Sequence, residues 1–254
     1  MKKRIAFFIG FLFGFSILYG AITGEQILKK VDERMIGEKS PQDLKAVMTM
    51  KIMSSSGTEK VRKLKTWSKN NPGDKDDWRM MKFMSPPDVE NMGFLVRSDD
   101  QMYLYLPEFR RIRRIASHNK TESFVGSDFS YEDMGTSGFA EFYKAVLVEE
   151  NDEEWVLELI RKKGADKPYP RIKMWVSKQS QLPSKMEMYD EDGTLWKVME
   201  EKNEKVNQYW ISVKIIMHNK KEGSWSSLNM DNIKVDQGIE DEIFTRRFLK
   251  RRVK

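Results

Sequence analysis

Cysteine is absent from the 254-residue sequence, and histidine occurs only as His118 and His218. The lack of cysteine excludes a disulfide, a thiolate nucleophile, a Cys-ligated zinc site and a lipid-modified N-terminal cysteine. The two histidines are far apart, and neither a Gly-x-Ser-x-Gly motif nor a glycine-rich phosphate loop occurs. We therefore predict a protein that is not an enzyme, with no catalytic residue, no cofactor and no metal site.

The net positive charge of the protein comes from the two ends of the chain. The formal net charge is +6, but residues 2–4 carry +3 and residues 246–254 carry +6 without any acid, which leaves −3 for the rest. A protein that covers nucleic-acid phosphates spreads its positive charge over a groove or a face. We therefore expect no nucleic-acid partner.

The first residues have the pattern of an export signal. The bases at residues 2–4 precede an uncharged, mainly apolar stretch at residues 5–19, as in a secretory signal peptide. We predict a signal peptide over residues 1–22 and a single mature domain over residues 23–254. An uncleaved membrane anchor is the alternative interpretation.

Alternation of apolar and polar residues is the main pattern of the mature chain. Leu44, Ala46, Met48, Met50 and Ile52 alternate along one segment, which predicts a strand with one apolar face. Similar segments, separated by turn residues, continue to residue 235. They predict a mainly β protein with about ten or eleven antiparallel strands and no division into domains.

Helical periodicity is found at the two ends of the mature chain. Thr23 and Gln26 match a capping box in front of a short amphipathic helix. Residues 240–252 predict a second helix, with acids in its first turn and bases in its last. Between the strands, residues 118–138 form a long polar loop with one helical turn near residues 130–134. A meander with one apolar face must close or be covered, so we expect the helices to cover that face.

The apolar positions of the strands are rich in methionine. Flexible thioethers suit a surface that accepts variable apolar ligands, but they also fill ordinary protein cores. Periodicity alone leaves both interpretations open. The residues concerned are Met48, Met50, Met80, Met81, Met102, Met174, Met186, Met188 and Met217.

Two central segments resemble a known family. They are residues 103–115, Tyr-Leu-Tyr-Leu-Pro-Glu-Phe-Arg-Arg-Ile-Arg-Arg-Ile, and residues 123–134, Ser-Phe-Val-Gly-Ser-Asp-Phe-Ser-Tyr-Glu-Asp-Met. Both are similar to the outer-membrane lipoprotein-sorting (LolA-like) family, and more specifically to the branch often found with large lipid-exporting membrane pumps. Weaker similarities extend over nearly the whole mature chain. The resemblance implies a curved antiparallel sheet in the form of an open half-barrel, with helices against its concave side and an apolar hollow that takes up acyl chains.

The function implied by this resemblance is that of a periplasmic, monomeric lipid or lipoprotein carrier that reversibly buries acyl chains. The alternative is an adaptor that carries nothing and docks on an inner-membrane lipid-exporting transporter. If alternate strand residues face inward as we assume, the lipid-binding cavity is lined by one set of them. That set is Met48, Met50, Ile52, Trp67, Phe83, Leu95, Tyr103, Tyr105, Met174, Met186 and Met188.

Four arginines form the most basic internal motif. One interpretation is a contact with lipid headgroups or an acidic partner. The alternative is a strand edge kept soluble by charge. The four residues are Arg110, Arg111, Arg113 and Arg114.

Three acids, Asp128, Glu132 and Asp133, lie in the long loop. A glycosidase carboxylate pair or a divalent-ion site is one interpretation. We expect instead that they cap the short helical turn or pair with the arginines.

Overall fold

The computed structural model describes residues 22–70, 77–135 and 138–253. The predicted signal peptide falls almost entirely on residues 1–21, which lie outside the described residues, so it stays a prediction. None of the described helices is long and apolar enough to cross a membrane.

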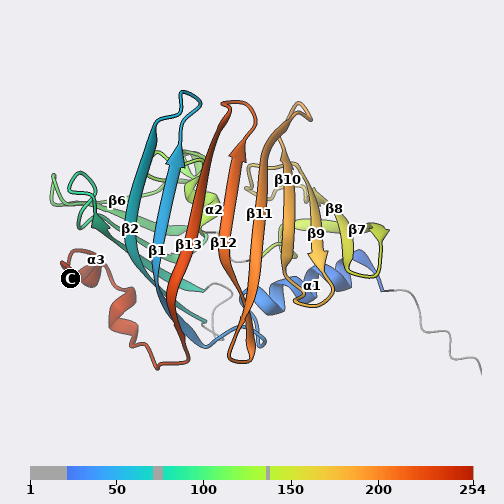
Figure 1. Ribbon diagram of the computed structural model, residues 1–254, viewed down its shortest axis with the longest axis horizontal. Helices are drawn as coiled ribbons and strands as arrows, with labels where there is room; N and C mark the ends of the chain where they lie inside the picture. The colour runs from blue at the N-terminus through green and yellow to red at the C-terminus, as the bar shows by residue number, and fades with distance from the viewer. Residues whose placement is uncertain (1–21, 71–76, 136–137, 254) are drawn as a thin grey trace, which may run out of the picture.

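One antiparallel sheet of thirteen strands forms the body of the described chain (Figure 1). Its spatial order is β6-β5-β4-β3-β2-β1-β13-β12-β11-β10-β9-β8-β7. Strands that are adjacent in the sequence are paired in the sheet, except β6 and β7, which lie at its two edges. The first and the last strand, β1 and β13, pair with each other. The strands are β1 (Asp43–Met53), β2 (Glu59–Lys69), β3 (Trp78–Ser85), β4 (Gly93–Ser98), β5 (Gln101–Leu106), β6 (Arg111–Arg114), β7 (Tyr143–Glu150), β8 (Glu154–Arg161), β9 (Arg171–Ser177), β10 (Pro183–Tyr189), β11 (Leu195–Val206), β12 (Tyr209–Asn219) and β13 (Ser224–Val235).

The sheet is bent into an open half-barrel, as expected from the resemblance (Figure 1). Register shifts interrupt the ladders in several places, for example between Lys45 and Val47 in β1 and between Lys202 and Asn203 in β11. Such bulges increase the local twist and bend a strand. Because they recur along the meander, they favour a curved sheet over a flat one.

The strand count exceeds the predicted ten or eleven. β6 was not predicted because it has only four residues, three of them arginines. Ile112 is its sole half-buried side chain, so no apolar alternation marks it as a strand. Backbone pairing with β5, from Tyr103 opposite Arg114 to Leu106 opposite Arg111, defines it instead.

The N-terminal helix α1 (Gly24–Met35) lies against the concave side at the β7 end. Its predicted capping box is confirmed: Thr23 N donates to Gln26 Oε1 (2.9 Å), and Gln26 N donates to Thr23 Oγ1. Ile27, Leu28 and Val31 are fully buried in the concave-side core. The helix packs on β7 and β8, and so covers one end of the apolar face.

The long loop also packs into the concave side. It contains η1 (Ser117–Asn119) and α2 (Tyr131–Gly135), which confirms the predicted helical turn. Figure 1 shows α2 behind β1 and β13. Tyr131 and Met134 are buried in the same core as α1, so the loop is a second cover for the sheet.

The predicted C-terminal helix over residues 240–252 is wrong in two respects. It is broken into η2 (Asp241–Phe244) and α3 (Arg246–Leu249) by Thr245, which has an extended backbone and whose Oγ1 accepts from Phe248 N. It also packs on the outer face of β3 and β4, not on the concave face. Lys82 Nζ secures it by donating to the Leu249 carbonyl (2.7 Å).

Candidate acyl-chain cavity

A cavity of about 290 Å³ lies between the concave face of the sheet and the segments that cover it. Its walls come from α1, α2, the 167–169 segment and strands on both sides of the β1–β13 pair. Most of the lining surface is apolar. The volume is near the lower end of the range for small-ligand pockets, about 300–1,000 Å³.

Methionine is the most frequent residue of the cavity wall. The eight that line it come from both helices and from five strands, so flexible thioethers are spread over most of the wall. Such side chains adapt their shape to a ligand at little cost. They are Met35, Met48, Met81, Met134, Met186, Met188, Met199 and Met230.

Seven of the eleven predicted cavity residues belong to the concave-side core. Met48, Met186 and Met188 line the cavity itself. The other four lie in the same core without lining the cavity; they are Met50, Ile52, Phe83 and Met174. A role of any of these residues in lipid binding stays a prediction.

The prediction that Trp67, Leu95, Tyr103 and Tyr105 face the cavity is wrong. All four lie in a separate cluster with the C-terminal segment, on the opposite face of their strands. The Trp67 ring, for example, meets Phe248 edge-on at 5.9 Å. Because β3 to β5 are apolar on both faces, alternation does not tell which set points inward, and a choice that is one residue off selects the wrong face.

Part of the concave side is filled by the chain itself. The rings of Phe83 and Phe94 contact Phe124 at centroid distances of 5.9 and 5.1 Å, and Phe124 meets Tyr131 edge-on at 5.7 Å. These aromatic rings are buried over β3 and β4. The concave side therefore has a solid part under the loop and a hollow part over the centre of the sheet.

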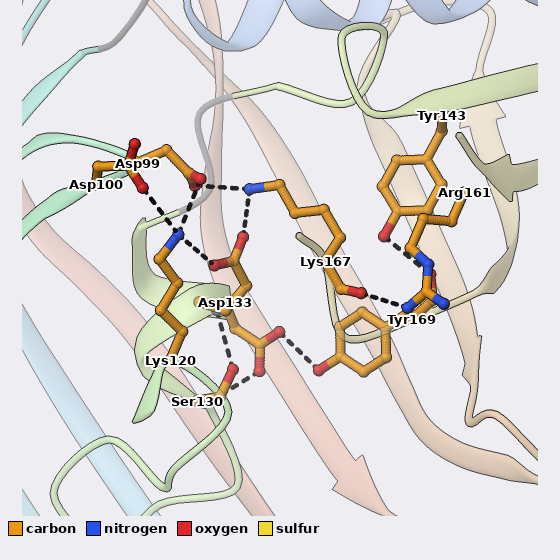
Figure 2. A network of polar contacts seen from close by, with 10 residues as sticks. Asp99, Asp100, Lys120, Ser130, Asp133, Tyr143, Arg161, Lys167 and Tyr169 are labelled. Atoms are coloured by element: carbon orange, nitrogen blue, oxygen red, sulfur yellow. Dashed lines mark hydrogen bonds and ion pairs between the residues drawn. The ribbon is translucent and has the colours of Figure 1, made fainter. Parts of the chain in front are cut away.

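A buried ion network holds the loop at the edge of the cavity (Figure 2). Lys167 Nζ lies 2.5 Å from Glu132 Oε1 and 2.7 Å from Asp99 Oδ1, and Lys120 Nζ lies 2.9 Å from Asp99 Oδ2. Burial raises the pKa of Glu132, although Lys167 opposes this. Burial also opposes ionisation of Asp99, but the hydrogen bonds and charges of Lys167 and Lys120 outweigh it and lower its pKa.

Asp133 joins the same region to β11. It accepts from Ser130 N (2.8 Å) at the start of α2, from Lys197 Nζ (2.9 Å) and from the Tyr169 hydroxyl (2.8 Å). Burial raises the pKa of Tyr169 well above its usual value, and the neighbouring Asp133 adds to this effect. The expected capping role of Asp133 is therefore confirmed.

The expected pairing of the loop acids with the arginine motif is wrong. Glu132 and Asp133 pair with lysines from distant parts of the sequence. Asp128 accepts from the hydroxyl of Ser226 (2.6 Å) on β13, and the Asp128 backbone N–H donates to the same hydroxyl oxygen (3.0 Å). Among the described residues, no group of three or more His, Cys, Asp or Glu is placed to hold a metal ion.

The arginine motif lies on the surface, away from the cavity. All four side chains are exposed, and none lines the cavity. Arg113 pairs with Glu122 (3.0 Å), and Arg114 Nη2 donates to the Asp100 carbonyl (2.7 Å). Arg110 lies beside Lys250 and Arg252 around a surface pocket. Contact of the four arginines with lipid headgroups or a partner stays a prediction.

Sequence reasoning missed several polar residues of the cavity wall, among them Glu201. It is half-buried on β11, next to Met199 on the same face. Burial raises its pKa to about 7. The signal was present in the sequence, since Glu201 has the inward parity of Met199, but a glutamate is normally assigned to the solvent side.

These features define a class of protein: an open antiparallel half-barrel with a methionine-lined cavity under helical covers. Solved structures with this architecture include a DUF1329 family protein from Desulfovibrio piger, which has 28% identity and a TM-score of 0.82 and matches over 89% of this chain and 97% of that chain. A domain named as an outer membrane lipoprotein-sorting protein, from Vibrio parahaemolyticus, has 27% identity and a TM-score of 0.81 over 90% of this chain and 98% of that chain.

A LolA superfamily protein from Nitrosomonas europaea shares the fold, with 22% identity and a TM-score of 0.70 over 90% of this chain and all of that chain. A family model described as "Uncharacterized protein"-like matches residues 75–251. No curated protein sequence matches the chain. The chain belongs to the family of that model, and its predicted resemblance to the LolA-like outer-membrane lipoprotein-sorting proteins is confirmed.

Proposed function

We propose that the protein is a periplasmic carrier or binding protein for the acyl chains of lipids or lipoproteins. The observation that carries the proposal is the methionine-lined cavity on the concave face of a LolA-like half-barrel. The similar domain from Vibrio parahaemolyticus is named as a lipoprotein-sorting protein, which supports the same class of ligand. A predicted signal peptide over residues 1–22 and a mature domain over residues 23–254 fit a periplasmic site of action.

Burial of the hydrocarbon chain supplies the binding energy in this proposal. Each methylene group that leaves water for the cavity contributes about 0.8 kcal/mol. A membrane offers the same chain a similar apolar environment, so transfer between membrane and protein is close to balanced and therefore reversible. A carrier needs this balance, because it must release what it takes up.

The solid part of the concave side favours the alternative function to a limited extent. An adaptor that carries nothing would have its hollow filled by its own chain, as the aromatic cluster of Phe94, Phe124 and Tyr131 fills the space over β3 and β4. The hollow part beside it, however, is lined mainly by apolar atoms and retains its volume. An unfilled apolar space lowers stability, so its retention favours a use for it, and we place the carrier function first.

The proposal is tested by filling the cavity. Met230 lines the cavity on β13 and is only partly buried, so the larger ring of Met230→Trp has space to enter it. We expect this variant to lose at least tenfold in affinity for a fluorescent long-chain fatty acid, measured by titration. The matched control is Val148→Trp, on the exposed outer side of β7 (46% exposed), which should bind like the wild type. Equal binding by all three proteins would place the ligand elsewhere and contradict the proposal.

A further inference from the structure

A single carboxyl group is set into the apolar wall of the cavity. Glu201 projects from β11 between two inward-facing neighbours, Met199 on its own strand and Ile215 opposite it on β12. The only hydrogen-bond partner that the described chain offers its carboxyl group is the Ser212 hydroxyl. A polar group in such a place fixes the orientation of a ligand in many binding sites.

The hydrogen bonds around Ser212 favour a protonated Glu201. Ser212 Oγ lies within hydrogen-bonding distance of Glu201 Oε2 and of Asn203 Oδ1 (2.6 Å). The orientation of the Asn203 amide is fixed, because its Nδ2 donates to the Pro183 carbonyl (2.7 Å). A serine hydroxyl has one hydrogen and donates to only one of the two oxygens. Both contacts are hydrogen bonds when Glu201 is protonated. In that state Glu201 Oε2 donates to Ser212 Oγ, and Ser212 Oγ donates to Asn203 Oδ1.

This arrangement leaves the second oxygen of Glu201 as a carbonyl acceptor. No described residue donates to Oε1, and the side chain lines the cavity. Protonation is consistent with the location, since burial raises the pKa of Glu201 to about 7. An acceptor that is removed from bulk water gains most from a ligand that brings a donor.

The other charged groups of the cavity wall are held by protein partners. Arg34 of α1 donates to Gln181 (3.3 Å), and Glu132 and Asp133 of α2 face Lys167 and Lys197. Asp77, just before β3, and Arg79, within it, also line the wall and have interactions of their own. Tyr143 and Tyr169 complete the titratable groups. Glu201 differs from Glu132 and Asp133 in that its partner is a hydroxyl group and not a lysine.

We propose that Glu201, oriented by Ser212 and Asn203, is a hydrogen-bonding subsite for acyl ligands that carry an N–H or O–H donor at their polar end, such as amide-linked chains. The inference rests on the proposed function, because it assumes that an acyl chain occupies the cavity. It adds a selectivity that apolar walls alone do not provide. An ester-linked chain of equal length has no donor and leaves Oε1 without a partner.

The test compares two probes that differ only in the donor: the N-methyl amide and the methyl ester of one fluorescent long-chain fatty acid. Titrations at pH 6 keep Glu201 protonated. We expect the wild type to bind the amide about tenfold more tightly, which corresponds to about 1.4 kcal/mol for one net hydrogen bond. Glu201→Gln should keep this ratio, because its amide donates to Ser212 and retains a carbonyl oxygen. Glu201→Met should bind both probes equally, with the ester affinity unchanged.

The control is Glu204→Met, an exposed residue of the same strand, which should keep the tenfold ratio. Equal affinities of the wild type for the two probes, or a preference that survives in Glu201→Met or is lost in Glu201→Gln, would overturn the subsite and leave the carrier function standing. If the wild type bound neither probe, the proposed function itself would fail, and the subsite with it.

Discussion

Removal of Lys167 is the sharpest test of the ion network that holds the loop against the sheet. The side chain is 3% exposed and pairs with Glu132, which is 2% exposed, at 2.5 Å. Lys167→Met leaves the Glu132 carboxylate buried with Lys120 Nζ at 4.0 Å. Removing one partner of a buried ion pair costs about 3–5 kcal/mol, because the remaining charge loses its compensation. We expect this loss in the free energy of unfolding, measured by urea denaturation at pH 7.

The double variant Lys167→Met/Glu132→Gln removes the buried carboxylate charge as well. We expect it to recover at least half of the loss, since Asp99 then keeps Lys120 as its partner (2.9 Å). The control is Lys173→Met, whose partner Glu149 is largely exposed, and this surface pair should contribute less than about 1 kcal/mol. A cost for Lys167→Met no larger than that of the control, or a double variant as unstable as the single one, would refute the reasoning.

Three further predictions concern stability. The pKa of Glu201 is raised from 4.5 to about 7. Its contribution to the stability of the fold is therefore fully present below pH 4.5 and is lost as the pH rises through 7. The stability of the wild type relative to Glu201→Gln should fall by up to about 3 kcal/mol between pH 4.5 and 8, measured by urea denaturation. The pKa of Lys82 is lowered by burial from 10.5 to about 8. The stability of the wild type relative to Lys82→Met should therefore rise between pH 8 and 10.5, and a flat difference would show that the lysine is hydrated. In Gly24→Ala the new Cβ would lie 2.6 Å from Leu147 N and 2.7 Å from Ala145 O. Because these are backbone atoms, α1 must shift, and we expect a loss of about 1–3 kcal/mol in the free energy of unfolding. An unchanged thermal midpoint would mean that α1 is not docked on β7.

Local patterns predicted the parts of the fold that they determine. Strict alternation from Leu44 to Ile52 identified β1, and Thr23 with Gln26 marked the start of α1, because each is a signal between near neighbours in the sequence. β6 has no such pattern, since three of its four residues are arginines. It becomes a strand through its pairing with β5.

The sequence predicts which side chains of a strand point into the half-barrel only where one face of the strand is polar. In β3, the neighbours Met80 and Met81 are both buried, but in separate clusters on opposite faces. The sequence does not reveal that the C-terminal segment returns to cover the outer face. Trp67, Leu95, Tyr103 and Tyr105 are buried under this segment and not in the cavity. The ion network was hidden for a similar reason: Asp99, Lys120 and Lys167 are far apart in the sequence and meet only in the folded chain.

Native mass spectrometry of the purified protein after incubation with phospholipid vesicles tests most directly whether the cavity holds an acyl chain. We predict a complex with one acyl-bearing lipid per chain in the wild type, and its loss in Met230→Trp but not in Val148→Trp. A wild-type spectrum that shows only the bare chain at every lipid concentration would contradict the carrier function.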